Sequence, residues 1–161
     1  MIEEYLALAE RIQQELDDLS RIANRAERAM KAARQRPQDL DLYLDSAVLN
    51  LHDYYAGLER IFQQIGTTVD GHIPKGSSWH RDLLQQMQTE INNVRPPVLS
   101  KEAGQLLDEF LRFRHVVRNI YAFNFDAERV QRLVEQMQPT LKRVRLELLT
   151  FISFLKHVGK S

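Results

Sequence analysis

Three arginines and a histidine fall within one short stretch, residues 112–118, of a chain whose formal net charge is zero. Successive residues of a helix are about 100° apart, so Arg114, Arg118 and Tyr121 share one face because they are spaced as i, i+4 and i+7. Two arginines on one face can bind a phosphate through charge-assisted hydrogen bonds. The spacing therefore predicts a cationic, phosphate-binding face near the end of a helix.

A second pair, His115 and Asn119, lies on the adjoining face of the same predicted helix. An imidazole can accept and donate a proton near neutral pH, whereas the amide of Asn119 cannot accept one. The pair thus adds one group that can move a proton. Beside both faces runs an apolar stripe that we expect to contact the core and to hold the polar side chains at its rim: Leu106, Phe110, Phe113, Val117 and Ile120.

The arginines also have a purely structural interpretation. Arg112, Arg114 and Arg118 can form ion pairs at helical spacing with carboxylates of the same helix, such as Asp108 and Glu109. Each such pair contributes only about 0.3–0.5 kcal/mol to stability. The physics of this stretch alone favours neither interpretation.

A second group of interest is Trp79, His80 and Asp82, at the predicted start of another helix. Trp79 is more simply interpreted as a core anchor, whereas His80 and Asp82 are positioned to line a pocket together with it. The chain has no set of metal ligands at a known spacing, no Gly-rich phosphate loop and no paired-carboxylate signature. We therefore expect neither a metal nor another cofactor.

The elements that must position these residues are helices. Apolar residues recur at three- and four-residue spacing in five segments, and four breaks separate them. The pattern predicts an all-α fold, an up-down antiparallel helical bundle of four long helices and one short helix, in a single domain over residues 1–161. The apolar segments are 5–30, 44–65, 79–94, 106–120 and 130–155, and the breaks are Pro37, Gly66–Gly76, Arg95–Val98 and Asn124–Asp126.

Capping residues mark where these helices begin. Asp39 or Asp41 is expected to cap the second helix, and Ser77 or Ser78 the third. Two further caps and one irregularity complete the prediction: Ser100 before the fourth helix, Asp126 before the fifth, and a kink at Pro139 within the fifth.

Composition limits the possible functions. The absence of cysteine excludes disulfides and thiol catalysis and fits a reducing cytosol. With 22 acidic and 22 basic residues, a broad electrostatic surface for duplex nucleic acid is not expected, so any nucleic-acid contact must be local. No long apolar run or basic leader is visible, so we expect a cytoplasmic protein with no membrane partner.

The run Arg-His-Val-Val-Arg-Asn-Ile-Tyr, residues 114–121, resembles the signature of the HEPN superfamily, in particular of the HepT-like ribonuclease toxins. That signature is an arginine, an adjacent polar residue, a histidine five positions after the arginine, and a tyrosine two positions further. Arg114, His115 and Tyr121 match three of these positions. Asn119 occupies the histidine position.

The resemblance implies a small helical protein, usually a homodimer, that cleaves RNA without a metal. It also implies a partner, a minimal nucleotidyltransferase (MNT) that acts as antitoxin and can attach AMP to the motif tyrosine, Tyr121 in this chain. The catalytic residues expected on this basis are Arg114, His115, Arg118 and Asn119, with the arginines stabilising the scissile phosphate.

Asn119 leaves the mechanism open, because it cannot accept the proton that the motif histidine would take. Either His115 supplies that function, or catalysis is only positional and electrostatic. The alternative is a catalytically silent helical module that binds nucleotide, RNA or a partner protein through the same cluster. A purely structural bundle is a third possibility. The resemblance favours the RNA-cleaving toxin of a toxin–antitoxin pair as the leading hypothesis.

Overall fold

The computed structural model describes residues 2–119 and 125–160. Within them the chain forms five α-helices and no strand, which confirms the predicted all-α fold of four long helices and one short one. None of these helices is long and apolar enough to cross a membrane. Their bounds are α1 Ile2–Gln35, α2 Leu40–Ile65, α3 Trp79–Met87, α4 Lys101–Asn119 and α5 Ala127–Lys160.

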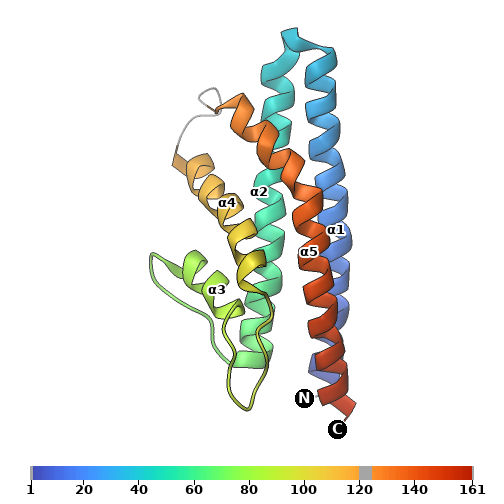
Figure 1. Cartoon of the computed structure of the whole chain (residues 1–161), viewed down its shortest axis with the longest axis vertical. Helices are drawn as coiled ribbons and strands as arrows, with labels where there is room; N and C mark the ends of the chain where they lie inside the picture. Colours follow the sequence, from blue (N-terminus) through green and yellow to red (C-terminus); the bar gives the residue numbers. More distant parts are fainter. Residues whose placement is uncertain (1, 120–124, 161) are drawn as a thin grey trace.

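The three longest helices, α1, α2 and α5, run side by side along the molecule, and the two ends of the chain lie together (Figure 1). α1 and α2 form the predicted antiparallel hairpin, which turns through a short 3-10 helix at Pro37–Asp39. α4 contacts α2 and α5, and α3 contacts α2 and α4. The bundle therefore places α3 and α4 next to each other on one side of α2.

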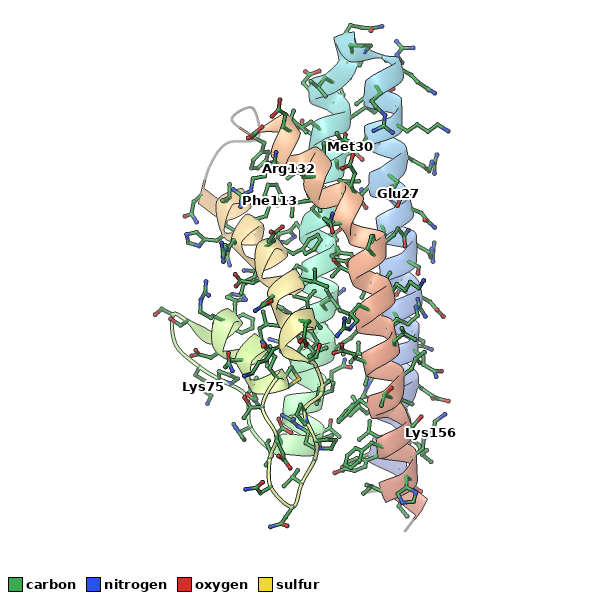
Figure 2. The ribbon with its side chains drawn as sticks, in the orientation of Figure 1. Glu27, Met30, Lys75, Phe113, Arg132 and Lys156 are labelled. Carbon is green, nitrogen blue, oxygen red and sulfur yellow. The ribbon has the colours of Figure 1, made fainter. Side chains whose placement is uncertain are left out.

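The predicted apolar stripes of α1, α2 and α5 are buried, and together they form the core. In α4 the predicted Phe110 and Phe113 are buried, but Leu106 differs from the prediction. Leu106 is 38% exposed, while Leu107 is fully buried, because the helix faces both α2 and α5 on its Leu107 side. Arg114 follows Leu107 at i+7 and therefore lies toward the buried side of α4, with its side chain 15% exposed. Figure 2 shows Phe113 on the inner side of the same helix.

Two breaks also differ from the prediction. The segment Gly66–Asp70, expected as loop, continues α2 as a short π-helical stretch. α3 ends at Met87, so Val94 is outside the helix and 41% exposed. The chain reverses there because the amides of Val98 and Leu99 donate to the carbonyl of Met87, at 2.8 and 3.0 Å.

The side-chain caps of α4 and α5 are confirmed, whereas those of α2 and α3 are not. The Ser100 hydroxyl accepts the amide of Ala103 at 3.1 Å, and Asp126 accepts the amide of Glu128 at 3.0 Å. Asp39 and Ser78 occupy the cap positions of α2 and α3 without forming a side-chain cap hydrogen bond. α5 continues through Pro139, and Figure 1 shows it bent along its length.

Candidate functional site

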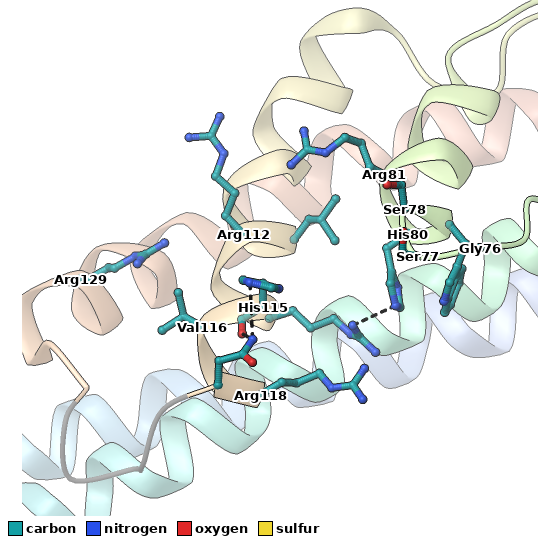
Figure 3. Close-up of a pocket in the computed structure, with 14 residues that line it drawn as sticks. Gly76, Ser77, Ser78, His80, Arg81, Arg112, His115, Val116, Arg118 and Arg129 are labelled. Atoms are coloured by element: carbon teal, nitrogen blue, oxygen red, sulfur yellow. Dashed lines mark hydrogen bonds between the residues drawn. The ribbon is translucent and has the colours of Figure 1, made fainter.

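α4 and the start of α3 border a cleft of about 790 Å³. Arg114, His115, Arg118 and Asn119 from α4 all line it, as the sequence spacing predicts for one end of that helix. Figure 3 shows Arg118 extending from α4 toward the segment that carries Gly76 and His80. The cleft is therefore lined by the predicted arginine face and by Trp79 and His80 of the second predicted group.

The lining of this cleft is strongly cationic. No aspartate or glutamate of the described chain lines it. A concave surface of one sign of charge concentrates ligands of the opposite sign. The basic residues that line it are Arg81, Arg112, Arg114, Arg118, Arg129, His80 and His115.

The positive charges of these arginines are neutralised by neighbouring groups to different degrees. Arg112 forms an ion pair with Asp108 at 2.6 Å, and Arg81 approaches the same carboxylate at 3.5 Å. Arg129 lies over the ring of Phe113, with its guanidinium carbon 5.5 Å from the ring centroid. In the described part of the chain Arg118 has no ion pair or hydrogen bond. The structural interpretation, pairing within α4, thus applies to Arg112 alone.

Arg114 joins a cluster that spans three helices. Its Nη1 lies 3.2 Å from Nε2 of His80, and its Nε lies 3.6 Å from Oε1 of Glu59 on α2. Nδ1 of His80 lies 2.6 Å from Oε2 of Glu59. The side chains are 15% (Arg114), 18% (His80) and 6% (Glu59) exposed. Tertiary contacts, rather than helical spacing, therefore hold Arg114 at the edge of the cleft.

The hydrogen-bonding roles in this cluster follow from its donors and acceptors. An arginine offers only donors, so Nε2 of His80 accepts from Arg114. The ring proton then sits on Nδ1 and is donated to the Glu59 carboxylate. A carboxylate that fixes a histidine in this tautomer leaves the electron pair on Nε2, where it is engaged by Arg114 at the edge of the cleft.

Arg114 has unused hydrogen-bonding capacity. Its Nε is buried and has no hydrogen-bond partner among the described atoms. Leaving a buried donor unpaired costs free energy, about 1–3 kcal/mol. A ligand with acceptor oxygens would recover part of that cost if the guanidinium moved slightly toward it.

His115 and Asn119, in contrast, are both exposed on the outer part of α4. The amide nitrogen of Asn119 donates to the backbone carbonyl of His115 at 2.6 Å and lies 3.4 Å from its Nε2. His115 is not hydrogen-bonded to any described carboxylate. Its ring is therefore less firmly oriented than that of His80.

The other predicted residues are placed as follows. Trp79 is partly buried against the core, as a core anchor would be, and its ring centroid lies 3.5 Å from that of His80. Asp82 is exposed and does not line the cleft. Tyr121, the predicted AMP acceptor, and Ile120 lie outside the described residues.

Glu59 is a residue that sequence reasoning missed. It lies between Tyr55 and Phe62 on a face of α2 that is otherwise buried and apolar. A carboxylate at such a position needs a partner, because burying an unpaired charge is very costly. Burial, together with the Glu59 carboxylate, raises the pKa of the neighbouring Tyr55. That phenol therefore stays neutral, and it contributes no charge beneath the cluster.

The arrangement can hold an anion against two arginines and place an imidazole of fixed orientation beside it. These are the components needed to stabilise a phosphate and to accept a proton from a neighbouring hydroxyl. Among the described residues, no group of three or more histidine, aspartate or glutamate side chains is placed to hold a metal ion.

Comparison with known proteins gives one match. A family model described as "HepT-like protein" matches residues 46–155, which include Glu59, His80, Arg114 and Asn119. No curated protein and no solved structure matches the chain significantly.

Proposed function

The chain belongs to the HepT-like protein family, and we propose that it is a metal-independent ribonuclease, the toxin of a toxin–antitoxin pair. In this reaction the 2′-oxygen of a ribose attacks the adjacent phosphorus and the bond to the 5′-oxygen breaks. The products are a 2′,3′-cyclic phosphate and a 5′-hydroxyl. The function needs a cationic clamp on the phosphate and a group that receives the 2′-hydroxyl proton.

The observation that carries this proposal is the position of Arg114. It is a mostly buried arginine whose Nε lies 3.6 Å from Glu59 without forming a hydrogen bond, at the edge of a cleft lined by five arginines and no described carboxylate. Arg118, one turn further along α4, adds a second guanidinium without a described partner. Two such groups can share the equatorial oxygens of a phosphorane, where negative charge increases in the transition state.

Within this function His115 and Asn119 complete the proposed site. Asn119 can donate a hydrogen bond to a phosphate or ribose oxygen but cannot accept a proton near neutral pH. The imidazole of His115 can bind a phosphate oxygen and can also exchange a proton, so His115→Ala is expected to lower the cleavage rate more than Asn119→Ala.

The experiment is cleavage of a labelled RNA by the purified protein in excess chelator. Arg114→Ala and Arg118→Ala should each lower the rate about 100-fold or more, because each removes charge from the developing phosphorane. Arg28→Ala, which removes an exposed arginine of α1, a helix that does not line the cleft, is the matched control and should cleave at the wild-type rate. Equal rates for all four proteins would contradict the proposal.

A homodimer is part of the proposed function. Two clefts facing each other across a two-fold axis would give a longer cationic groove than one cleft can. Sedimentation at tens of micromolar should show a dimer that binds RNA. A monomer that binds and cleaves RNA would remove the dimer from the proposal.

The family also implies a nucleotidyltransferase antitoxin, and we propose that this partner regulates the site through Tyr121. An AMP group there, three residues after Arg118 in sequence, would bring a phosphate close to the cationic face and compete with RNA. Mass spectrometry after co-expression should find AMP on Tyr121. Adducts found only on other residues would contradict this regulation.

A second function is supported by Asn119 itself. Because it replaces the motif histidine, the chain is also suited to bind RNA, nucleotide or a partner protein through the same arginines without cleaving. Wild-type protein that binds RNA, with loss of binding in Arg114→Ala but no cleavage at any pH, would favour this module over the ribonuclease.

A further inference from the structure

His80 is the one histidine in the cleft lining that is oriented by a carboxylate. Glu59 lies 2.6 Å from its Nδ1, and the Trp79 ring lies against its face with centroids 3.5 Å apart. Its Nε2 is directed to Arg114, and the dashed line in Figure 3 marks this contact. A histidine held on three sides has a single orientation and a single tautomer.

From this geometry we propose that His80, positioned by Glu59, is the catalytic base that takes the 2′-hydroxyl proton during RNA cleavage. The inference rests on the proposed ribonuclease function and assigns to another helix the role that Asn119 cannot fill. Nothing in the pattern of residues 114–121 points to His80, because it is 34 positions before Arg114 in the chain.

The step is consistent with the contacts that His80 makes. In the free protein Nε2 accepts an N–H from Arg114. When a substrate phosphate attracts that guanidinium, the 2′-hydroxyl can replace it as the donor to Nε2. The 2′-oxygen then attacks phosphorus, its proton moves to Nε2, and the 5′-oxygen leaves after taking a proton from solvent. The imidazolium of His80 returns its proton to solvent, so that atoms and charge balance.

Glu59 acts as a positioning residue in this scheme. Its carboxylate keeps the Nδ1 proton in place and stabilises the imidazolium that forms when Nε2 takes a proton. Besides Glu59 from α2, the charged and titratable groups that line the cleft with His80 come from three helices: Arg81 from α3, Arg112, Arg114, His115 and Arg118 from α4, and Arg129 from α5. The carboxylate is thus the only described anion bonded to the ring, and it opposes the surrounding cations.

His115 is the competing candidate, and it differs from His80 in its surroundings. It is exposed, and its described neighbour is the amide of Asn119 at 3.4 Å rather than a carboxylate. A base without an orienting partner spends less time in the reactive position. His115 is better suited to bind the RNA backbone than to take the proton.

The test is the single-turnover cleavage rate as a function of pH for four proteins: wild type, His80→Gln, Glu59→Gln and His115→Ala. His80→Gln keeps an N–H that can donate to Glu59, so folding is expected to survive. Its rate should fall about 100-fold or more and lose the titrating limb at low pH, while binding of a 2′-deoxy analogue is unchanged. Glu59→Gln should keep that limb but cleave more slowly, because the amide can still accept from Nδ1.

Each outcome decides the inference. If His115→Ala loses the titrating limb and His80→Gln keeps it, the inference is overturned while the ribonuclease function stands. If His80→Gln weakens binding of the deoxy analogue as much as cleavage, His80 is a structural residue and the inference fails. If the wild type does not cleave RNA at any pH, the proposed function fails and the inference with it.

Discussion

Arg95 and Arg114 are both mostly buried and both contact a buried carboxylate, yet their surroundings differ. Arg95 binds Asp70 with both side chains fully buried, and its remaining donors reach the carbonyls of Thr89, Pro96 and Gln86 at 2.9, 3.0 and 3.1 Å. Arg114 is partly open to a cleft, and its Nε has no hydrogen-bond partner among the described residues.

The difference separates a structural arginine from a candidate functional one. Every donor group of Arg95 is satisfied inside the protein, so it has nothing to offer a ligand. It fixes the loop between α3 and α4 to the end of α2, which holds the start of α3 in place. Arg114 keeps part of its hydrogen-bonding capacity unused beside cationic neighbours. An arginine that lines a cleft and keeps one donor without a hydrogen bond is the feature that marks a candidate binding site.

The largest expected effect is on stability, from Arg95→Ala. This change leaves Asp70 buried with only Gln86 as a side-chain partner, and breaking a buried ion pair costs about 3–5 kcal/mol. For a chain of this size the melting temperature should fall by roughly 6–20 °C. Arg81→Ala, with the side chain 66% exposed, is the matched control and should melt close to wild type. Similar melting temperatures for both variants would contradict the structural role.

The second prediction concerns Arg114, the candidate functional arginine, in the variant Arg114→Lys. A lysine keeps the charge but loses the planar fork that contacts His80 and Glu59 together. Cleavage should fall about 10- to 100-fold, whereas stability should fall by no more than about 1–2 kcal/mol. Arg95→Lys should show the reverse: its melting temperature should fall more than that of Arg114→Lys, while its folded fraction should cleave RNA at a near-normal rate. Parallel losses in both variants would remove the distinction.

The smallest effect is expected at a third arginine–carboxylate cluster, which is more exposed than the other two. Glu147 accepts from the amide and hydroxyl of Ser100 at 2.6 and 2.8 Å and from Arg143 at 2.6 Å. Burial raises the pKa of Glu147, but the Ser100 amide and Arg143 lower it more, so it lies below its usual range. Glu147→Gln should therefore cost about 1 kcal/mol at neutral pH.

The pH dependence of that loss has a defined sign. A carboxylate whose pKa is lower in the folded state adds stability above its unfolded pKa of about 4.3, and this stability is lost as pH falls through the folded pKa. The difference in melting temperature between wild type and Glu147→Gln should be constant from pH 7 to about pH 5 and shrink below about pH 4. Glu10→Gln, at an exposed position, is the control. A difference that grows on acidification would contradict the assignment.

The sequence predicted the features that depend on local spacing. The helices, the stripes of α1, α2 and α5, and the caps at Ser100 and Asp126 all follow from periodicity and from residue types within one turn. Arg114 and Arg118 both line the cleft because they are one helical turn apart, which the sequence also predicted. Each of these features involves residues only a few positions apart, so a linear pattern is sufficient.

Features that depend on how helices meet were not predictable in this way. The burial of Arg114 follows from the rotation of α4 between α2 and α5, which also exposes Leu106. The contacts of His80 join residues 21 and 34 positions apart, so no motif contains them. One signal was present in the sequence: Glu59 interrupts an apolar face of α2, and a buried carboxylate requires a cationic or hydrogen-bonding partner.

The proposed reaction is cleavage of RNA through the 2′-hydroxyl at the cleft around Arg114. The most direct measurement is product analysis by mass spectrometry on two oligonucleotides that differ only in one 2′-hydroxyl at a cleaved position, with chelator present. We expect a 2′,3′-cyclic phosphate and a 5′-hydroxyl from the ribose substrate, no cut at the 2′-deoxy position, and loss of both products with Arg114→Ala. Cleavage at the 2′-deoxy position, or the same products at the same rate from Arg114→Ala, would contradict it.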